Sequence, residues 1–193
     1  MDPVERQIFL DFLQTKPMKA WGGIILHHSA TPDSNKSHNI AAIRRYHKSY
    51  RVDGEIVSGA VWEERRAKRD GKIFLEPWRD VSYHFMLERR NNKIVYEVGR
   101  PFDEDGAHSG HKTSNRFNTT HLGICVVGNF DVKEPDIELW RTTLAFTRIF
   151  RTYLEIPKES VIGHCEVYGL LGVGKEKSCP GEFWSMAKFR TEL

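Results

Sequence analysis

The stretch Gly22-Gly23-Ile24-Ile25-Leu26-His27-His28-Ser29 decides how this chain folds. Three consecutive aliphatic residues follow two glycines and run directly into polar side chains. A short continuous apolar run bounded in this way predicts a strand that is buried on both faces of a sheet. We expect the chemistry of the protein to lie among the polar residues at the end of this strand.

Segments of helical and extended pattern alternate along most of the chain on either side of this strand. Asp2 as N-cap, Pro3 at the first helical position and Glu5 as the second half of a capping box predict a helix over residues 2–14. Further helices are predicted over 39–50, 63–69, 137–154 and 182–190, and further strands over 83–88, 93–98, 122–127 and 161–165. Residues 99–121 are expected to form a binding loop. The alternation predicts an α/β fold in which helices flank a central β-sheet.

Length and composition limit the class of protein. A chain of 193 residues is expected to form a single domain, residues 1–193, because domains hold roughly 100–200 residues. Its 29 Lys and Arg against 26 Asp and Glu give a net charge of only +3, which is mild for a protein that binds nucleic acid. No apolar run reaches the roughly 20 residues of a membrane span, and charged residues interrupt the N-terminal segment. We therefore expect no membrane span, no signal peptide and synthesis in a cytoplasm.

Histidines at strand ends and a cysteine in a loop form a candidate metal site. Cys179 lies 15 residues after His164, which ends one predicted strand, and His27 ends another. Two imidazoles and one thiolate are a zinc donor set that leaves a fourth position for water, although packing and hydrogen bonding are the alternative on spacing alone. The total of three cysteines makes a disulfide framework a poor interpretation. We expect Cys125 and Cys165 to be buried reduced thiols.

Six sequence blocks resemble one family of enzymes in both content and order. The blocks are Leu26-His27-His28-Ser29-Ala30-Thr31, Val81-Ser82-Tyr83-His84-Phe85, Gly106-Ala107-His108, Leu122-Gly123-Ile124-Cys125-Val126-Val127-Gly128, Gly163-His164-Cys165-Glu166-Val167 and Lys177-Ser178-Cys179-Pro180. Over roughly residues 22–190 the chain resembles the zinc N-acetylmuramoyl-L-alanine amidases of type 2, which include phage lysozyme-type amidases and animal peptidoglycan recognition proteins. The resemblance implies a central mixed β-sheet flanked by helices.

The resemblance also implies a ligand set for zinc, the cofactor of the family. By this likeness His27, His164 and Cys179 hold the ion, and His27 rather than His28 is the first ligand. Strand geometry is consistent with that choice, because successive side chains of a strand point to opposite faces. We expect His28 to pack or hydrogen-bond behind the site, and the same alternation directs Cys165 away from His164.

The remaining site residues follow from the resemblance as well. It places Tyr83 and Lys177 in the cleft, where a phenol can donate a hydrogen bond to a developing oxyanion and an ammonium can neutralise it. His108 and Asn118 are implied to bind substrate. The loop is longer here than is usual in the family, so Asn115 competes with Asn118, and either side chain can instead cap a turn.

The chain departs from the family at both of its added segments. Residues 1–20 form a helical extension, and residues 51–80 are an insertion whose basic residues could hold the protein near an anionic wall polymer, although a solvated helix face is the simpler interpretation. The implied activity is zinc-dependent hydrolysis of the amide bond between N-acetylmuramic acid and L-alanine in peptidoglycan, as in an endolysin or a wall-remodelling enzyme. The alternatives are a non-catalytic module that recognises muropeptides and, from the insertion, a module that binds a partner or nucleic acid.

Overall fold

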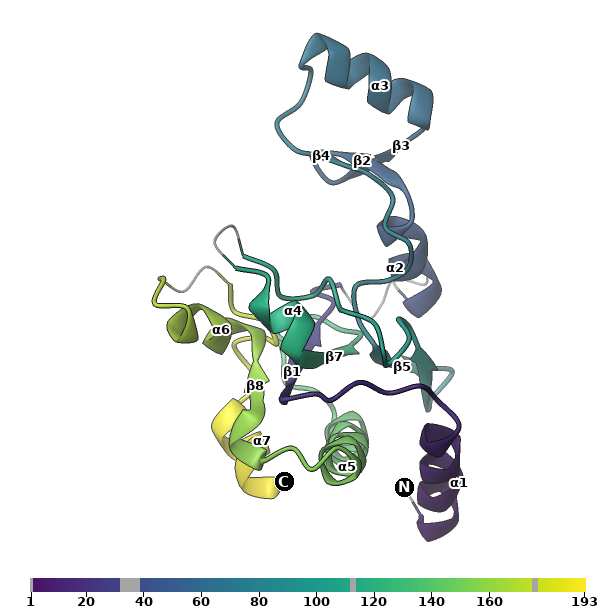
Figure 1. The fold of residues 1–193 in the computed structure, drawn as a ribbon, viewed down its shortest axis with the longest axis vertical. Coiled ribbons are helices and arrows are strands. Elements are labelled where there is room, and N and C mark those ends of the chain that lie inside the picture. Colours follow the sequence, from purple (N-terminus) through teal and green to yellow (C-terminus); the bar gives the residue numbers. More distant parts are fainter. Residues whose placement is uncertain (1, 32–38, 112–113, 175–176) are drawn as a thin grey trace.

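A five-stranded mixed sheet forms the centre of the computed structural model, which describes residues 2–31, 39–111, 114–174 and 177–193 (Figure 1). The strands are β1 (Gly23–His28), β5 (Phe85–Arg90), β6 (Lys93–Val98), β7 (His121–Val126) and β8 (Val161–Gly163), in the order β6-β5-β7-β1-β8. β1 is parallel to both β7 and β8, β5 is parallel to β7, and β6 is antiparallel to β5. The expected mixed sheet is confirmed.

The central strand β1 separates the hydrophobic core from the face that carries the site. All six of its residues are buried, as the apolar run predicts. Ile24 and Leu26 belong to the largest core cluster, whereas Ile25 packs with Phe117 in a separate small cluster. Because side chains alternate along a strand, His27 lies on the same face as Ile25.

Helices cover both faces of the sheet. They are α1 (Pro3–Gln14), α2 (Ile40–His47), α4 (Arg116–Thr120), α5 (Ile137–Tyr153), α6 (His164–Leu170) and α7 (Met186–Glu192), with a 3₁₀ turn at Lys158–Ser160. The predicted capping box of α1 is formed, since the Asp2 side chain accepts from Glu5 N–H and Glu5 accepts from Asp2 N–H. α5 contributes eight buried residues and packs against β1, β5 and β6. Among the described residues, no helix is long and apolar enough to cross a bilayer.

The insertion folds as a small unit of its own beside the main sheet. β2 (Tyr50–Val52), β3 (Glu55–Val57) and β4 (Phe74–Leu75) form an antiparallel sheet in the order β3-β2-β4, and α3 (Gly59–Lys68) connects two of its strands. Figure 1 shows this unit standing away from the five-stranded sheet, beyond α2. Residues 51–80 contain seven basic and seven acidic side chains, so the unit carries no net charge. This balance argues against the insertion as a basic anchor for an anionic polymer.

Several predicted boundaries are wrong, and tertiary pairing or local capping explains them. The helix predicted over 39–50 ends at His47, because Tyr50 pairs with Val57 in the small sheet. The helix predicted over 63–69 begins already at Gly59, where the Ser58 side chain caps it. The final helix begins at Met186 rather than near 182, and the loop expected over 99–121 contains α4.

The strand predicted over 161–165 is also wrong, and this error affects the site. The strand ends at Gly163, and His164 and Cys165 form the first turn of α6. The Glu166 carboxylate accepts from Gly163 N–H at 2.8 Å and fixes the start of the helix. Strand alternation therefore cannot separate Cys165 from His164, as the sequence pattern led us to expect.

Candidate metal centre

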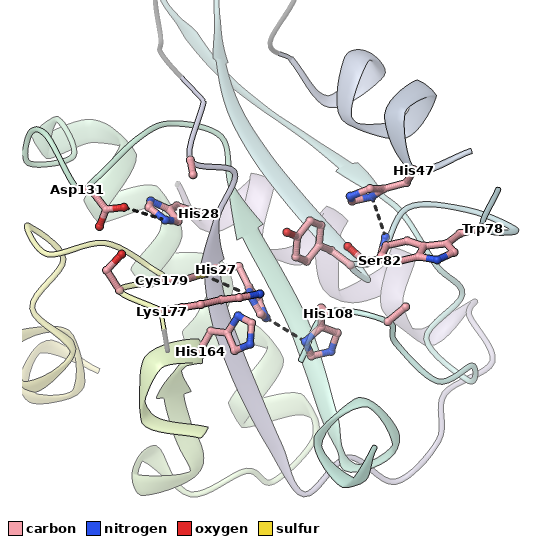
Figure 2. Close-up of a pocket in the computed structure, with 14 residues that line it drawn as sticks. His27, His28, His47, Trp78, Ser82, His108, Asp131, His164, Lys177 and Cys179 are labelled. Carbon is pink, nitrogen blue, oxygen red and sulfur yellow. Dashed lines mark hydrogen bonds and ion pairs between the residues drawn. The ribbon is translucent and has the colours of Figure 1, made fainter. Parts of the chain in front are cut away.

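Three side chains from distant parts of the chain meet at the carboxyl edge of the sheet (Figure 2). His27 is near the end of β1, His164 is the first residue after β8, and Cys179 lies in the loop before α7. Because β1 and β8 are parallel neighbours, their carboxyl ends lie at the same edge. One ligand atom from each of the three residues lies within 4.8 Å of the others, and Cys179 Sγ is 3.5 Å from His27 Nδ1.

The electrostatics of these three side chains suit a metal ion. Burial, reinforced by the charge of His164, lowers the pKa of His27 well below its usual range, and burial lowers the pKa of His164 to about 4. Both imidazoles are therefore neutral at physiological pH and keep a lone pair for coordination. Burial raises the pKa of Cys179 to about 12, so a cation is needed to make this side chain a thiolate. Two imidazole nitrogens and one sulfur fit zinc.

Backbone contacts hold the cysteine in place. Cys165 N–H, in the first turn of α6, donates to the carbonyl oxygen of Cys179 at 2.7 Å. The Cys179 loop is thus tied to the helix that begins with His164. Cys125 and Cys165 are free thiols, of which the first is buried as expected and the second is only half-buried.

A cleft of about 540 Å³ lies over the metal group. All three candidate ligands border it, and so do Tyr83, Lys177, His108, His28, His47, Trp78, Ser82 and Asp131. Among the described residues, no fourth His, Cys, Asp or Glu joins the metal group. The arrangement thus combines three donors with an opening to the cleft, which is the pattern of a metal site that works on a substrate.

Tyr83 and Lys177, which were expected in the cleft, both border it. The Tyr83 ring centroid is 5.1 Å from that of His27. Burial and the neighbouring Cys125 and Cys179 raise the pKa of Tyr83 well above its usual range, so the phenol keeps its proton at neutral pH. Lys177 is exposed, and its positive charge is among the causes that lower the pKa values of His27 and His164.

His108 and Asn118, expected to bind substrate, lie beneath the cleft wall. His108 is 6% exposed, and its Nδ1 is 2.9 Å from Nε2 of His27. The Asn118 side-chain oxygen accepts from the backbone N–H groups of His108 and Ser109, each at 2.8 Å. Asn118 also donates to Asn115, which is exposed. Of the two competing asparagines, Asn118 is thus the one that holds the loop.

His28 is not part of the metal group, in line with strand alternation. Its Nδ1 accepts from Phe130 N–H at 3.2 Å, and its ring stacks on that of Phe130. Its other nitrogen lies 3.7 Å from Asp131 at the border of the cleft (Figure 2). His28 therefore packs behind the site with one face and reaches the cleft with one edge.

Two further residues border the cleft that the sequence did not lead us to expect there, His47 and Trp78. His47 ends α2, and its Nδ1 accepts from Ser82 N–H at 3.3 Å. Trp78 comes from the insertion, donates its backbone N–H to the His47 carbonyl, and places its ring 4.8 Å from that of His47. No local pattern marks either residue, since both reach the cleft through the path of the insertion. His38, for which no site role was expected, lies outside the described residues.

Comparison with known proteins agrees with this fold and donor set. A family model described as N-acetylmuramoyl-L-alanine amidase matches residues 17–182, so the chain belongs to this amidase family. A short peptidoglycan-recognition protein of Drosophila melanogaster is 28% identical over 105 residues, which are 54% of this chain and 50% of that protein. The chain thus spans about half the length of the curated relatives it matches.

Solved structures share the fold at low sequence identity. The endolysin N-acetylmuramoyl-L-alanine amidase LysCS from Clostridium intestinale superposes with a TM-score of 0.57 at 19% identity, over 90% of this chain and 84% of that one. Drosophila peptidoglycan recognition protein SD superposes with a TM-score of 0.52 at 18% identity, over 86% and 79% of the two chains. The neighbours therefore include both an amidase and a recognition protein.

Proposed function

We propose that this protein is a zinc-dependent amidase that hydrolyses the bond between N-acetylmuramic acid and L-alanine in peptidoglycan, as a lytic or wall-remodelling enzyme. The observation that carries the proposal is the convergence of His27, His164 and Cys179 on one border of an open cleft. The family match gives the substrate class, and the endolysin neighbour supports action on cell walls. The chain is proposed to be a single domain over residues 1–193, with an extension over 1–20 and an insertion over 51–80.

The residues around the metal group match the needs of amide hydrolysis. Bound zinc supplies Lewis acidity, which makes water more acidic and polarises an amide carbonyl. Tyr83 keeps its proton at neutral pH and can donate a hydrogen bond to the oxygen that becomes negative in the transition state. The Lys177 ammonium can neutralise the same charge from the mouth of the cleft.

The alternative is a recognition module that binds a muropeptide in the same cleft without cutting it. The neighbouring recognition proteins keep this alternative open. The complete donor set, including Cys179 and accompanied by Tyr83, favours catalysis. Binding of nucleic acid has less support, because the insertion has no net charge.

The decisive experiment measures zinc content together with the fragments released from purified bacterial walls. We expect about one zinc per chain and release of stem peptides that stops when a chelator is added. Cys179→Ser should lose both metal and turnover, while Cys165→Ser, which alters a cysteine outside the metal group, should keep both. Bound zinc with walls left intact would favour the recognition module and contradict the proposed hydrolysis.

A further inference from the structure

A chain of hydrogen bonds behind the metal group determines which nitrogen of His27 faces the cleft. Nε2 of His108 lies 3.1 Å from the carbonyl oxygen of His121, and its Nδ1 lies 2.9 Å from Nε2 of His27. A carbonyl oxygen can only accept, so Nε2 of His108 carries the proton and its Nδ1 is left as an acceptor. His27 must then donate from Nε2, which leaves the lone pair of its Nδ1 free.

The free nitrogen of His27 is the one that faces the other donors. His27 Nδ1 is the atom that lies 3.5 Å from Cys179 Sγ. Burial lowers the pKa of His108 well below its usual range, which agrees with a ring that holds a single proton. The two histidines and the carbonyl thus form one directed relay that ends at the metal group.

The protein holds His108 rigidly from several sides. Asn118 accepts from the backbone N–H of His108, and Gly106 and Gly123 flank the ring. A Cβ atom added at Gly123 would lie 2.5 Å from Cδ2 of the His108 ring, so only glycine leaves room for it. The His84 ring packs against His108 at a centroid distance of 5.6 Å. A side chain seated in this way has little freedom to adapt to a substrate.

We infer that His108 is a positioning residue that fixes the tautomer and orientation of the metal ligand His27, and that Asn118 acts through His108. Ligand histidines commonly donate their second nitrogen to such a partner, and loss of the partner typically weakens metal binding about 10- to 100-fold. This role differs from the substrate contact that the family resemblance implies. The inference rests on the proposed function only in that the group binds a metal.

A pair of substitutions tests the relay. Asparagine can place its side-chain oxygen near the position of Nδ1, whereas glutamine places its amide near the position of Nε2. We expect His108→Gln to bind zinc about 10- to 100-fold more weakly in competition with a chromophoric chelator, and His108→Asn to restore most of the affinity. His47→Gln is the matched control, because it changes another cleft histidine that does not contact His27; its zinc affinity should equal that of the parent.

Two spectroscopic readouts keep the inference separate from catalysis and from misfolding. Long-range ¹H–¹⁵N correlation spectra of the unsubstituted protein should show the proton of His27 on Nε2, and cobalt absorption bands should change in His108→Gln but not in His47→Gln. A proton on Nδ1 of His27, or equal zinc affinity in parent, His108→Gln and His108→Asn, would overturn the inference. Failure to cut walls with this affinity pattern intact would overturn only the proposed function.

Discussion

At the scale of single residues, Tyr83 and Lys177 differ from the ligands in what their loss should do. Neither belongs to the metal group, yet both border the cleft. Tyr83→Phe should keep zinc and lower kcat by about 10²–10³, since one donor to the transition-state oxygen is lost. Lys177→Ala should also keep zinc and lose most of kcat. Steady-state kinetics with metal analysis checks both, and an unchanged kcat in either variant would remove that residue from the mechanism.

His84 predicts how acid destabilises the protein. Its Nδ1 accepts from Gly123 N–H at 2.9 Å and its Nε2 bonds to the Glu104 carbonyl at 3.0 Å, so the buried ring is held neutral. Burial lowers its pKa to about 4. The unfolded chain therefore binds more protons than the folded one between pH 6.5 and about 4, and stability falls as the pH drops through this window.

This loss of stability can be assigned to the residue. Complete protonation of His84 costs about 3 kcal/mol, with similar terms from other buried histidines. Urea unfolding of the metal-free protein should show the free energy of unfolding falling from pH 6.5 to 4, and His84→Asn should fall less steeply. The same slope in both proteins would contradict the assignment.

At the scale of elements, the insertion belongs to the cleft through Trp78. The ring of Trp78 borders the cleft, and the buried guanidinium of Arg51 lies 4.9 Å from it on β2. We expect Trp78→Ala to raise KM for wall fragments about fivefold, equivalent to ~1 kcal/mol of lost contact, with zinc content unchanged. Arg66→Ala is the control, since Arg66 stacks on Trp62 in the same insertion and does not border the cleft. Equal KM values in the two variants would exclude the insertion from substrate binding.

At the scale of the whole molecule, a bound ion would join segments that are far apart in the chain. His27 and Cys179 are 152 residues apart, and His164 joins them from the start of α6. Zinc at about 1,000 times its Kd should therefore stabilise the fold by about 4 kcal/mol, or roughly 10 °C in Tm for a chain of this size. Thermal melts with and without a chelator measure this shift. Cys179→Ser should abolish it and Tyr83→Phe should retain it; a parent protein that melts alike in both conditions would contradict the metal site.

Local pattern in the sequence was enough for the elements that build the sheet and for the residue types of the metal group. The apolar run ending at His27 predicts β1, and the caps and periodicity predict α1 and α5, because these signals act within a few residues. The two histidines and the cysteine could be proposed because each follows or interrupts such a signal.

Only the tertiary structure decided what surrounds those ligands. His108 meets His27 across 81 residues, Trp78 enters the cleft from a separate small sheet, and His164 starts a helix where the local pattern predicts a strand. Such contacts depend on strand order and on the path of the insertion, neither of which leaves a periodic signal in the chain. The sequence alone therefore determined the donors, whereas the fold determined their partners and the shape of the cleft, because hydrogen-bond direction and burial exist only once distant segments have packed together.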